Sequence, residues 1–357
     1  MKLSFKNILP ILLIFTLLIL FAGCFLTPST YIVTYNGNGN TSGVTPTDAN
    51  LYEQGALVKV LDKGSLVKTG YTFVDWNTAA DGSGTSQAAG STFNMGTANL
   101  TLYARWTTNT YTVTYNGNGN TAGTVPVDPT SPYEYGATVT VLGNTGDLTR
   151  INDGGTSYRF TGWNTKADGS GLDQAEGSYF TMDAFPVTLY AQWTPYVLRD
   201  IGPAGGYIFY DKGSYFGIFG SPIWRYLEAA LSNQSTSTEW GCYGTSIPGA
   251  DGTAVGTGEQ NTIDIQAAGC ATAGIAADIC ANLSLGGYND WFLPSKDELN
   301  LMYENLKLFG VGGFAGGGYW SSSEYGADSA RGQDFYNGSQ YNYGKDYYKR
   351  VRAVRAF

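Results

Sequence analysis

The sequence of 357 residues contains no histidine. That absence excludes Ser-His-Asp and Cys-His catalysis, together with every metal site built on imidazole. A catalytic site here would have to use carboxylates, Lys, Tyr or Cys, and no pair of acidic residues is recognisable as one for glycoside hydrolysis. We therefore expect a protein that is not an enzyme, with no catalytic residue, no metal site and no cofactor.

Charge is also scarce, because Asp, Glu, Lys and Arg make up 14% of the chain, against roughly 25% in ordinary soluble proteins. The formal net charge is −9, and so acidic a chain is a poor binder of nucleic acid. Glycine (49 residues) and tyrosine (27 residues) are abundant instead. With 15% aromatic residues, this composition favours turn-rich β structure over disorder.

Cysteine is rare as well, and the first of the four cysteines ends a targeting signal. Two lysines precede an apolar stretch, residues 8–22, that is too short for a comfortable membrane span. Its end, Phe-Ala-Gly-Cys, resembles the lipobox of bacterial lipoproteins, which implies removal of residues 1–23 and lipidation of Cys24. The next residue is Phe25 rather than Asp, so the resemblance favours a lipid anchor in the outer membrane or at the cell surface, with residues 24–30 as a tether.

The other cysteines are Cys242, Cys270 and Cys280, an odd number in an exported chain that permits disulfides. Cys270 and Cys280 flank a helical segment, in which ten residues span roughly 15 Å. That separation exceeds the reach of a disulfide unless the helix breaks. The preferred pair is therefore Cys242 with Cys270, which leaves Cys280 as a buried free thiol.

Two segments of the chain repeat, residues 31–107 and residues 111–194. YIVTYNGNGNTSG returns as YTVTYNGNGNTAG, FVDWNTAADGSG as FTGWNTKADGSG, and LTLYARWT as VTLYAQWT. Alternating residues and Asn-Gly turns predict short, half-buried strands in each copy. The second copy is about seven residues longer, and the insertion is best placed in the Gly/Asn/Asp-rich residues 143–156.

This pattern resembles the Listeria–Bacteroides repeat of bacterial surface proteins, known from the internalin B-repeat. The resemblance implies two small β-grasp-like domains in tandem. Four tryptophans recur at corresponding positions of the copies: Trp76, Trp106, Trp163 and Trp193. We favour a core role for them over a ligand platform. Asp81 and Asp168 each stand alone among glycines, far short of a calcium loop, and are predicted to shape turns.

The composition changes again at about Asp200, and residues 200–357 are predicted to form a third domain. Its motifs GPAGGYIFYD, YNDWFLPSKDELNLMY, YWSSSEY and VRAVRAF resemble the C-terminal domain of the Legionella collagen-like adhesin and its bacterial relatives. The resemblance implies an α+β, C-type-lectin-like fold. That adhesin domain is associated with sulfated polysaccharide binding and trimer formation, so an anionic polysaccharide, a host or matrix glycan and a second copy of the chain are the partners to test.

Local patterns predict the elements of this third domain. Residues 224–231 are interpreted as a short helix, and residues 261–282 as a helix in two pieces broken by a glycine. Ser295 with Glu298 forms a capping box, which predicts the start of a longer helix that ends at a glycine. Residues 349–357 are predicted to be one final strand.

Basic and aromatic side chains gather near the C-terminus and make up the candidate ligand-binding site: Lys345, Lys349, Arg350, Tyr347 and Tyr348. The cations would attract an anionic glycan, and the tyrosine rings would stack on sugars.

Four other conspicuous residues are assigned to the interior instead. Arg352 and Arg355 lie on opposite faces of the expected strand, so at least one is expected to point inward and pair with a carboxylate. Trp291 and Trp320 are more easily explained as core than as sugar platforms.

Three functions compete on this basis. The first is a surface lipoprotein that presents a lectin-like binding or adhesion domain on two repeats. The second is a purely structural envelope protein without a specific ligand, and the third is a carbohydrate-active enzyme.

Lipidation of Cys24 is directly testable. We expect the wild-type protein to partition into the detergent phase on detergent phase separation, because stable anchoring takes more than one acyl chain and a lipidated N-terminal cysteine carries several. Cys24→Ala should move the protein to the aqueous phase and alter its processing. A Cys24→Ala protein that is processed and partitioned like wild type would contradict the lipobox interpretation.

Overall fold

The computed structural model describes residues 28–152, 156–213 and 224–357. The expected signal peptide and Cys24 lie outside the described residues. The chain forms two compact units. One comprises the chain up to Val113 with Thr130–Val139 and Phe180–Val187, and the other comprises Thr114–Pro129, Thr140–Tyr179 and Thr188–Phe357. Among the described residues, no helix is long and apolar enough to cross a membrane.

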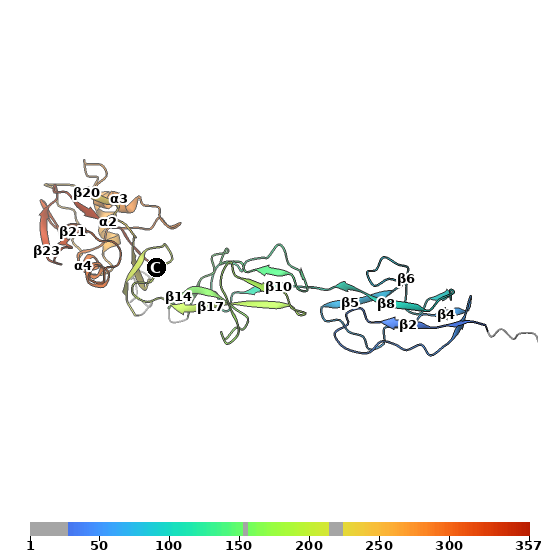
Figure 1. Ribbon diagram of the computed structural model, residues 1–357. Helices are drawn as coiled ribbons and strands as arrows, with labels where there is room; N and C mark the ends of the chain where they lie inside the picture. Colours follow the sequence, from blue (N-terminus) through green and yellow to red (C-terminus); the bar gives the residue numbers. More distant parts are fainter. Residues whose placement is uncertain (1–27, 153–155, 214–223) are drawn as a thin grey trace, which may run out of the picture. The chain divides into compact units, whose positions relative to one another are not determined.

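The first repeat is built from short strands, drawn in blue and cyan in Figure 1. Their bounds are β1 (Thr30–Tyr31), β2 (Val33–Asn36), β3 (Tyr52–Glu53), β4 (Leu57–Lys59), β5 (Tyr71–Asn77), β6 (Ser86–Gln87), β7 (Thr92–Asn94) and β8 (Leu100–Thr108). The main sheet has the order β2-β8-β5-β6, in which β2 runs parallel to β8. Two strand pairs, β1–β3 and β4–β7, flank it.

The core of the first repeat is local to that repeat. Alternation along β2 turns Val33 and Tyr35 inward, where they meet the fully buried Trp76. The indole of Trp76 donates a hydrogen bond to the Leu61 carbonyl at 2.9 Å, and its ring lies 4.7 Å from that of Tyr35. Trp163 is equally buried in the second repeat. The core role predicted for these two tryptophans is therefore confirmed.

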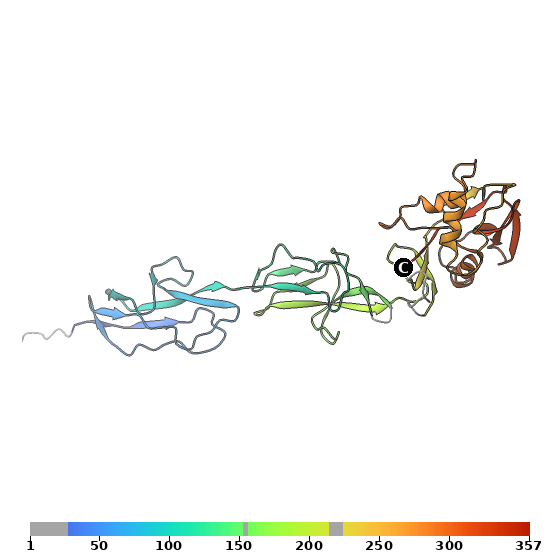
Figure 2. The ribbon, with the colours of Figure 1, turned by 180° about the vertical axis from the view of Figure 1, so that it is seen from behind.

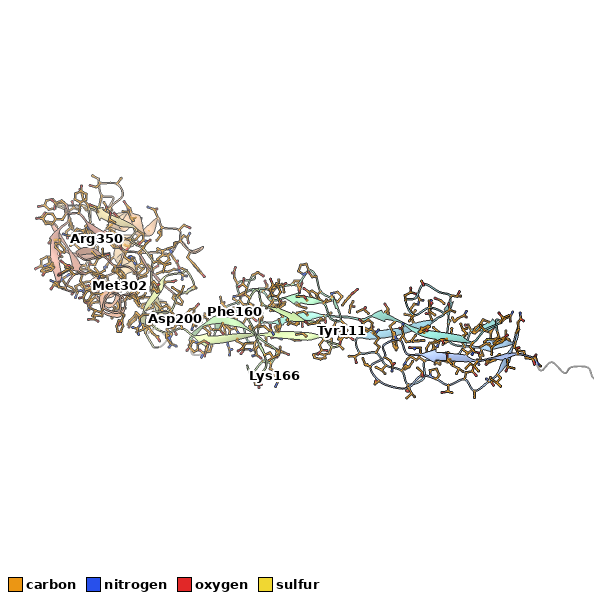
Figure 3. The ribbon with its side chains drawn as sticks, viewed as in Figure 1. Tyr111, Phe160, Lys166, Asp200, Met302 and Arg350 are labelled. Atoms are coloured by element: carbon orange, nitrogen blue, oxygen red, sulfur yellow. A yellow bond between two sulfur atoms is a disulfide. The ribbon has the colours of Figure 1, made fainter. Side chains whose placement is uncertain are left out.

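The second repeat has the same strand order with one addition. Its strands are β9 (Thr110–Tyr111), β10 (Val113–Asn116), β11 (Tyr133–Glu134), β12 (Thr138–Thr140), β13 (Arg150–Ile151), β14 (Ser157–Asn164), β15 (Asp173–Gln174), β16 (Tyr179–Thr181) and β17 (Val187–Pro195). The order β10-β17-β14-β13 places an extra strand, β13, beside β14. Most of the insertion expected at residues 143–156 thus belongs to the β13–β14 hairpin. Figure 3 labels Tyr111, in the first strand of this repeat.

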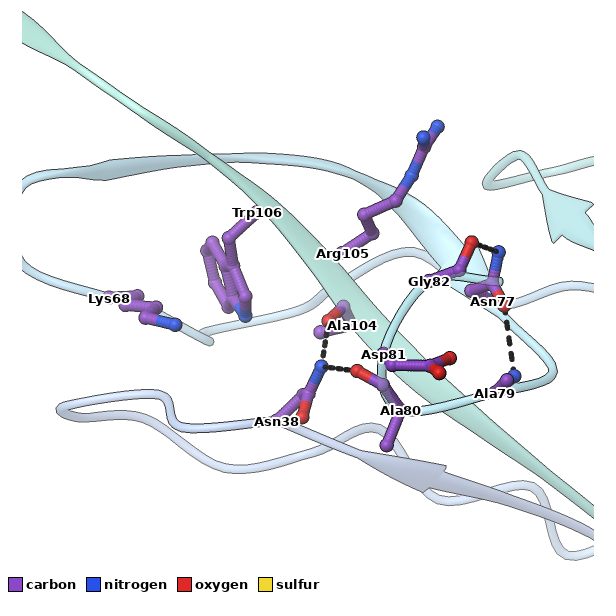
Figure 4. A pocket seen from close by; sticks show the side chains of 10 residues that line it. All are labelled: Asn38, Lys68, Asn77, Ala79, Ala80, Asp81, Gly82, Ala104, Arg105 and Trp106. Carbon is purple, nitrogen blue, oxygen red and sulfur yellow. Dashed lines mark hydrogen bonds between the residues drawn. The ribbon is translucent and has the colours of Figure 1, made fainter. Parts of the chain in front are cut away.

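An asparagine side chain ties each repeat together at the Asn-Gly-Asn-Gly turn. Asn38 has φ +49°, a left-handed conformation that asparagine tolerates better than most residues. Its amide nitrogen donates to the carbonyls of Ala80 (2.8 Å) and Ala104 (3.0 Å), which belong to a loop and to β8 (Figure 4). Asn118 repeats both contacts in the second copy, with Ala167 and Ala191.

The C-terminal domain combines helices with two sheets, as both ribbon views show (Figures 1 and 2). A three-stranded sheet has the order β18-β19-β25, and a five-stranded sheet has the order β20-β24-β21-β22-β23. The strands are β18 (Tyr207–Asp211), β19 (Tyr226–Ala229), β20 (Ser235–Thr238), β21 (Gly318–Gly326), β22 (Ser329–Asp334), β23 (Gln340–Gly344), β24 (Lys349–Val351) and β25 (Val354–Ala356). The helices are α2 (Gly258–Ala267), α3 (Ala276–Ala281), α4 (Lys296–Asn305) and the short 3-10 helix η2 (Lys307–Phe309).

The helix expected at residues 224–231 is wrong, because this segment contains β19. All four residues of β19 are buried, and the strand is central, hydrogen-bonded to β18 on one side and to β25 on the other. A strand covered on both faces loses the polar–apolar alternation by which strands are recognised. The buried Glu228 accepts hydrogen bonds from the backbone of Ala204 and Gly206.

The other helix predictions are largely confirmed. α2 and α3 are separated around Gly269, whose φ is +63°. Ser295 and Glu298 form the reciprocal capping box that begins α4, and Gly310 follows η2 in a left-handed conformation. Phe309, which the helical period places in the apolar stripe, is instead 60% exposed because the last turn tightens into a 3-10 helix.

The last nine residues are two strands rather than one. β24 belongs to the five-stranded sheet and β25 to the three-stranded sheet, so the chain changes sheets at Arg352 and Ala353. Arg352 is buried and donates to the carbonyls of Ala230 and Gly312 and to the Asn233 side chain, at 2.7–3.0 Å. Burial lowers its pKa to about 10.

Arg355 takes the carboxylate partners that were expected of at least one of these arginines. Its guanidinium pairs with Glu228 at 3.0 Å and with Asp290 at 2.5 Å.

The cysteines lie around one of the two cores of this domain. Cys242 and Cys270 are joined by a disulfide with a Cα–Cα distance of 4.9 Å. Cys280 is a free thiol packed beside Trp291 and Trp320 in the same cluster, and its burial raises the pKa of the thiol.

The Asn38 contacts predict a measurable stability effect in an isolated first repeat, residues 28–110, which should unfold cooperatively because its core is local. Asn38→Ala removes two hydrogen bonds and a residue suited to positive φ, so urea unfolding should show a loss of about 2 kcal/mol. The exposed Asn94→Ala is the control and should change stability by less than about 0.5 kcal/mol. Equal stability of the two variants would show that the asparagine contact does not hold the repeat together.

Candidate functional site

The structure does not bring the three predicted cations together. Lys345 is 0% exposed and lies in the turn between β23 and β24. Its ammonium donates to Glu324 at 2.5 Å and to the Thr245 carbonyl at 2.6 Å, and it lies 4.8 Å from the Trp240 ring centroid. A side chain with these partners cannot reach a ligand, so Lys345 is corrected from a candidate site residue to part of a buried ion pair.

Lys349 and Arg350 also lie apart, on opposite faces of one strand. They are neighbours in β24, and successive side chains of a strand project from opposite faces. Lys349 lies on the face of Val351 and Trp320, whereas Arg350, labelled in Figure 3, lies on the face of Arg352. Among the described residues neither cation forms an ion pair. A single cationic patch of the three residues is therefore not formed.

One of these faces gathers aromatic side chains around Lys349. We call it the tyrosine–lysine face, and it consists of Tyr341, Tyr343, Tyr347 and Lys349. The ammonium of Lys349 lies 4.1 Å from the Tyr343 ring centroid and 5.7 Å from that of Tyr347. The rings of Tyr341 and Tyr343 are 5.8 Å apart. Tyr347 is 56% exposed, and Tyr341 is exposed as well.

Two glycines in the sheet make room for this arrangement. A Cβ on Gly332 would come within 3.0 Å of the Tyr343 ring, and one on Gly318 within 2.7 Å of the Lys349 side chain. Beneath them the buried Trp320 meets Tyr343 edge-on, with ring centroids 5.9 Å apart. The Tyr343 ring therefore rests on a packed floor, which fixes its orientation before any ligand arrives.

Tyr348 stands apart from this face. Its hydroxyl donates a hydrogen bond to the Glu239 carboxylate at 2.8 Å, and this hydrogen bond raises the pKa of Tyr348. The ring is 62% exposed. Of the five predicted site residues, the structure thus leaves Tyr347 and Lys349 on one surface, with Tyr341 and Tyr343 as members that the sequence analysis did not select.

The chemistry offered by the tyrosine–lysine face is stacking. An aromatic ring presents a negative face, which attracts the C–H groups of a sugar ring as it attracts the Lys349 ammonium. The one ammonium can also contact a single sulfate or carboxylate. Across the described ranges no group of three or more His, Cys, Asp or Glu side chains could hold a metal ion.

The first repeat contains a small hollow, which its turns enclose (Figure 4). It holds about 180 Å³ and is bordered by Asn38, Lys68, Asp81, Arg105 and Trp106. The side-chain amide of Asn38 and the indole N–H of Trp106 donate hydrogen bonds to backbone carbonyls. Asp81 accepts hydrogen bonds from Ser83 within its own loop. These hydrogen bonds lower the pKa of Asp81. The turn role predicted for Asp81 accounts for the geometry.

Comparison with known proteins identifies the repeated part of the chain. Residues 31–105 and 111–192 match the Listeria-Bacteroides repeat domain. The chain carries two Listeria–Bacteroides repeat domains. The family expected from the sequence motifs of the repeats is thereby confirmed.

Curated relatives share part of the chain. A protein of Evansella cellulosilytica named as a Gly-rich membrane protein is 40% identical over 167 residues, which are 46% of this chain and 18% of that protein. Internalin H of Listeria monocytogenes is 32% identical over 183 residues, 49% of this chain and 27% of that protein. The chain spans less than a third of the length of either relative.

Two solved structures are also similar in part. A fimbrial protein from Bacteroides ovatus is 12% identical with a TM-score of 0.32, covering 92% of this chain and 100% of the other. Streptococcal SHIRT domains 3–4 from a cell surface protein are 11% identical with a TM-score of 0.20, covering 47% and 99%. TM-scores of this size do not establish a shared fold.

The burial of Lys345 beside Glu324 predicts that two lysine substitutions in the C-terminal domain lower the free energy of unfolding by very different amounts. Lys345→Met leaves the Glu324 carboxylate buried without its cation and should lower the free energy of unfolding by about 3–5 kcal/mol. Adding Glu324→Gln should recover part of the loss. Lys349→Met, on the surface, should cost less than about 1 kcal/mol. Urea unfolding followed by near-ultraviolet circular dichroism measures all three, and equal effects of the two lysines would refute the burial of Lys345.

Proposed function

We propose that the protein is a lipid-anchored protein of the bacterial cell envelope that presents a glycan-binding, adhesive C-terminal domain beyond its two repeats. Cys24 carries the lipid, and the repeats separate the anchor from the binding domain. The repeat family and the relatives named as membrane proteins and internalin support a place at the cell surface. The parallel pairing of β2 with β8 supports a β-grasp-like repeat.

The C-terminal domain is proposed to be C-type-lectin-like. Its sequence motifs support this assignment, and so does the combination of α2, α3 and α4 with two sheets that the last segment of the chain connects. The domain acts by binding and not by catalysis. The absence of histidine and of a recognisable carboxylate pair from the sequence supports a non-enzymatic role.

The observation that carries the proposed function is the exposure of tyrosine rings beside the packed Tyr343 on the tyrosine–lysine face. Tyr341 and Tyr347 remain in water although the domain has two apolar cores in which rings are buried. The Tyr343 ring, which packs on Trp320, loses little conformational entropy when a ligand covers it. The ligand is accordingly a glycan whose sugar rings stack on the tyrosines, with Lys349 able to contact one anionic group.

A glycan array probed with the chain from residue 28 to residue 357 tests this function. We expect binding to a defined set of glycans, and Tyr347→Ala should weaken it about tenfold, the effect of about 1–2 kcal/mol for one stacked ring. Lys349→Ser should weaken binding to sulfated members only, and that difference should vanish at high salt because screening acts over about 8 Å at physiological ionic strength. Tyr336→Ala, which removes an 85% exposed ring in the turn between β22 and β23, is the matched control.

The competing functions give different outcomes. A purely structural envelope protein would bind no glycan on the array. A carbohydrate-active enzyme would release reducing ends from the same glycans, which a turnover assay detects. Binding that Tyr347→Ala and Lys349→Ser leave unchanged would remove the tyrosine–lysine face as the site.

A further inference from the structure

A cleft lies where the second repeat meets the C-terminal domain, within one compact unit. It consists of two adjoining hollows of about 740 Å³ and about 290 Å³. The larger hollow is within the range of roughly 300–1,000 Å³ typical of ligand sites, which occur preferentially where domains meet. Both hollows share five lining residues: Thr149, Tyr158, Tyr196, Pro203 and Tyr288.

The second repeat supplies one wall of this cleft, next to its additional strand β13. Thr149 and Tyr158 stand on the β13–β14 hairpin, and β13 has no counterpart in the first repeat. Phe160, labelled in Figure 3, continues the wall along β14. Thus the repeat next to the C-terminal domain is the one that carries the additional hairpin.

Direct contacts hold the two walls in place. The Arg225 guanidinium forms a two-pronged ion pair with Asp211 at 2.7 and 3.0 Å and donates to the hydroxyl of Thr156 at 2.6 Å. The Nε of Arg159 lies 3.6 Å from a carboxylate oxygen of Asp200. The cleft is therefore anchored from both sides of the junction.

The lining is aromatic and its rings are oriented. The Arg355 guanidinium covers one face of Tyr288 at 3.8 Å, and Arg150 lies 5.1 Å from the Tyr158 ring. Tyr196 stands edge-on to Phe357, with ring centroids 5.6 Å apart. Burial raises the pKa of Tyr196 to about 12, so its phenol stays neutral at physiological pH.

The backbone at the cleft is already paired, which argues against an extended peptide as the occupant. The carbonyl of Thr149 accepts from the N–H groups of Thr121 and Ala122, and the N–H of Ile151 donates to the Thr121 hydroxyl. A peptide that adds a strand needs a free sheet edge. Side-chain rings and hydroxyls are what the cleft offers instead.

We propose that this cleft is a second carbohydrate-binding site, which takes a neutral oligosaccharide. The sugar rings lie against Tyr158 and Tyr288, and the half-exposed Arg159 guanidinium donates to their hydroxyls. Neutral sugars fit because the charge of Arg159 is offset by Asp200 and by Asp147 at the rim, and that of Arg355 by Glu228 and Asp290. This site is separate from the tyrosine–lysine face, so either site can exist without the other.

Calorimetric titration of the chain from residue 28 to residue 357 tests the inference, with neutral cello-, xylo-, manno- and chito-oligosaccharides of four to six sugars as probes. We expect at least one series to bind. Tyr158→Ala should weaken that binding tenfold or more, and Arg159→Ala, which removes a half-exposed side chain and its contact with Asp200, about threefold or more. Tyr71→Ala, at the corresponding position of the first repeat, is the matched control and should leave binding unchanged.

Each outcome bears on the inference. Loss of binding with Tyr158→Ala and Arg159→Ala but not with Tyr347→Ala supports it. No binding in any series, binding insensitive to both cleft variants, or binding lost only with Tyr347→Ala overturns it, and the last result leaves the proposed function intact. Binding of unstructured peptides from a random library, in a way that none of the sugars displaces, would also overturn it. Unchanged near-ultraviolet circular dichroism of the variants excludes unfolding as the cause of a loss.

Discussion

The buried guanidinium of Arg352 is the interaction on which the C-terminal domain depends. A charged group out of water is costly unless its hydrogen bonds are replaced, and here two backbone carbonyls and the Asn233 side chain replace them without a carboxylate. Those acceptors fix the point where the chain leaves one sheet and enters the other. The strand before this point carries Lys349 to the tyrosine–lysine face, and the strand after it carries Arg355 and Phe357 to the cleft. Both proposed sites therefore depend on one crossing.

The scarcity of charge in the sequence acquires a physical explanation in this domain. Several of the few cations form ion pairs within the domain: Lys345 with Glu324, Arg225 with Asp211, and Arg355 with Glu228 and Asp290. Little positive charge is left for attracting a polyanion, in a chain whose formal net charge is −9. What the surface offers instead is tyrosine, an apolar ring with a polar tip that suits a wet interface. Recognition by stacking is the mode consistent with both facts.

Much of the fold could be predicted from local sequence. The repeats are recognisable because asparagine and glycine at positive φ recur together with the strands that they connect. The capping box of Ser295 and Glu298 is recognisable because it needs only four consecutive residues. The prediction failed where distant chain segments decide. β19 reads as a helix because both of its faces are buried and its side chains do not alternate. Lys345 reads as a surface cation because its partner, Glu324, is 21 residues away. The cleft could not be predicted because its walls come from two domains, although the extra residues of the second repeat were a signal that something there differs.

Aromatic ¹H–¹³C spectra of the protein with ring-labelled tyrosine test the central claim, glycan recognition by the tyrosine–lysine face, most directly. The protein is titrated with a heparin-derived hexasaccharide and, separately, with a neutral hexasaccharide such as cellohexaose. The structure predicts that a glycan which binds this face shifts the ring signals of Tyr341, Tyr343 and Tyr347 while that of Tyr336 stays in place. Saturable binding of the heparin-derived hexasaccharide that leaves those three rings unshifted would contradict the claim.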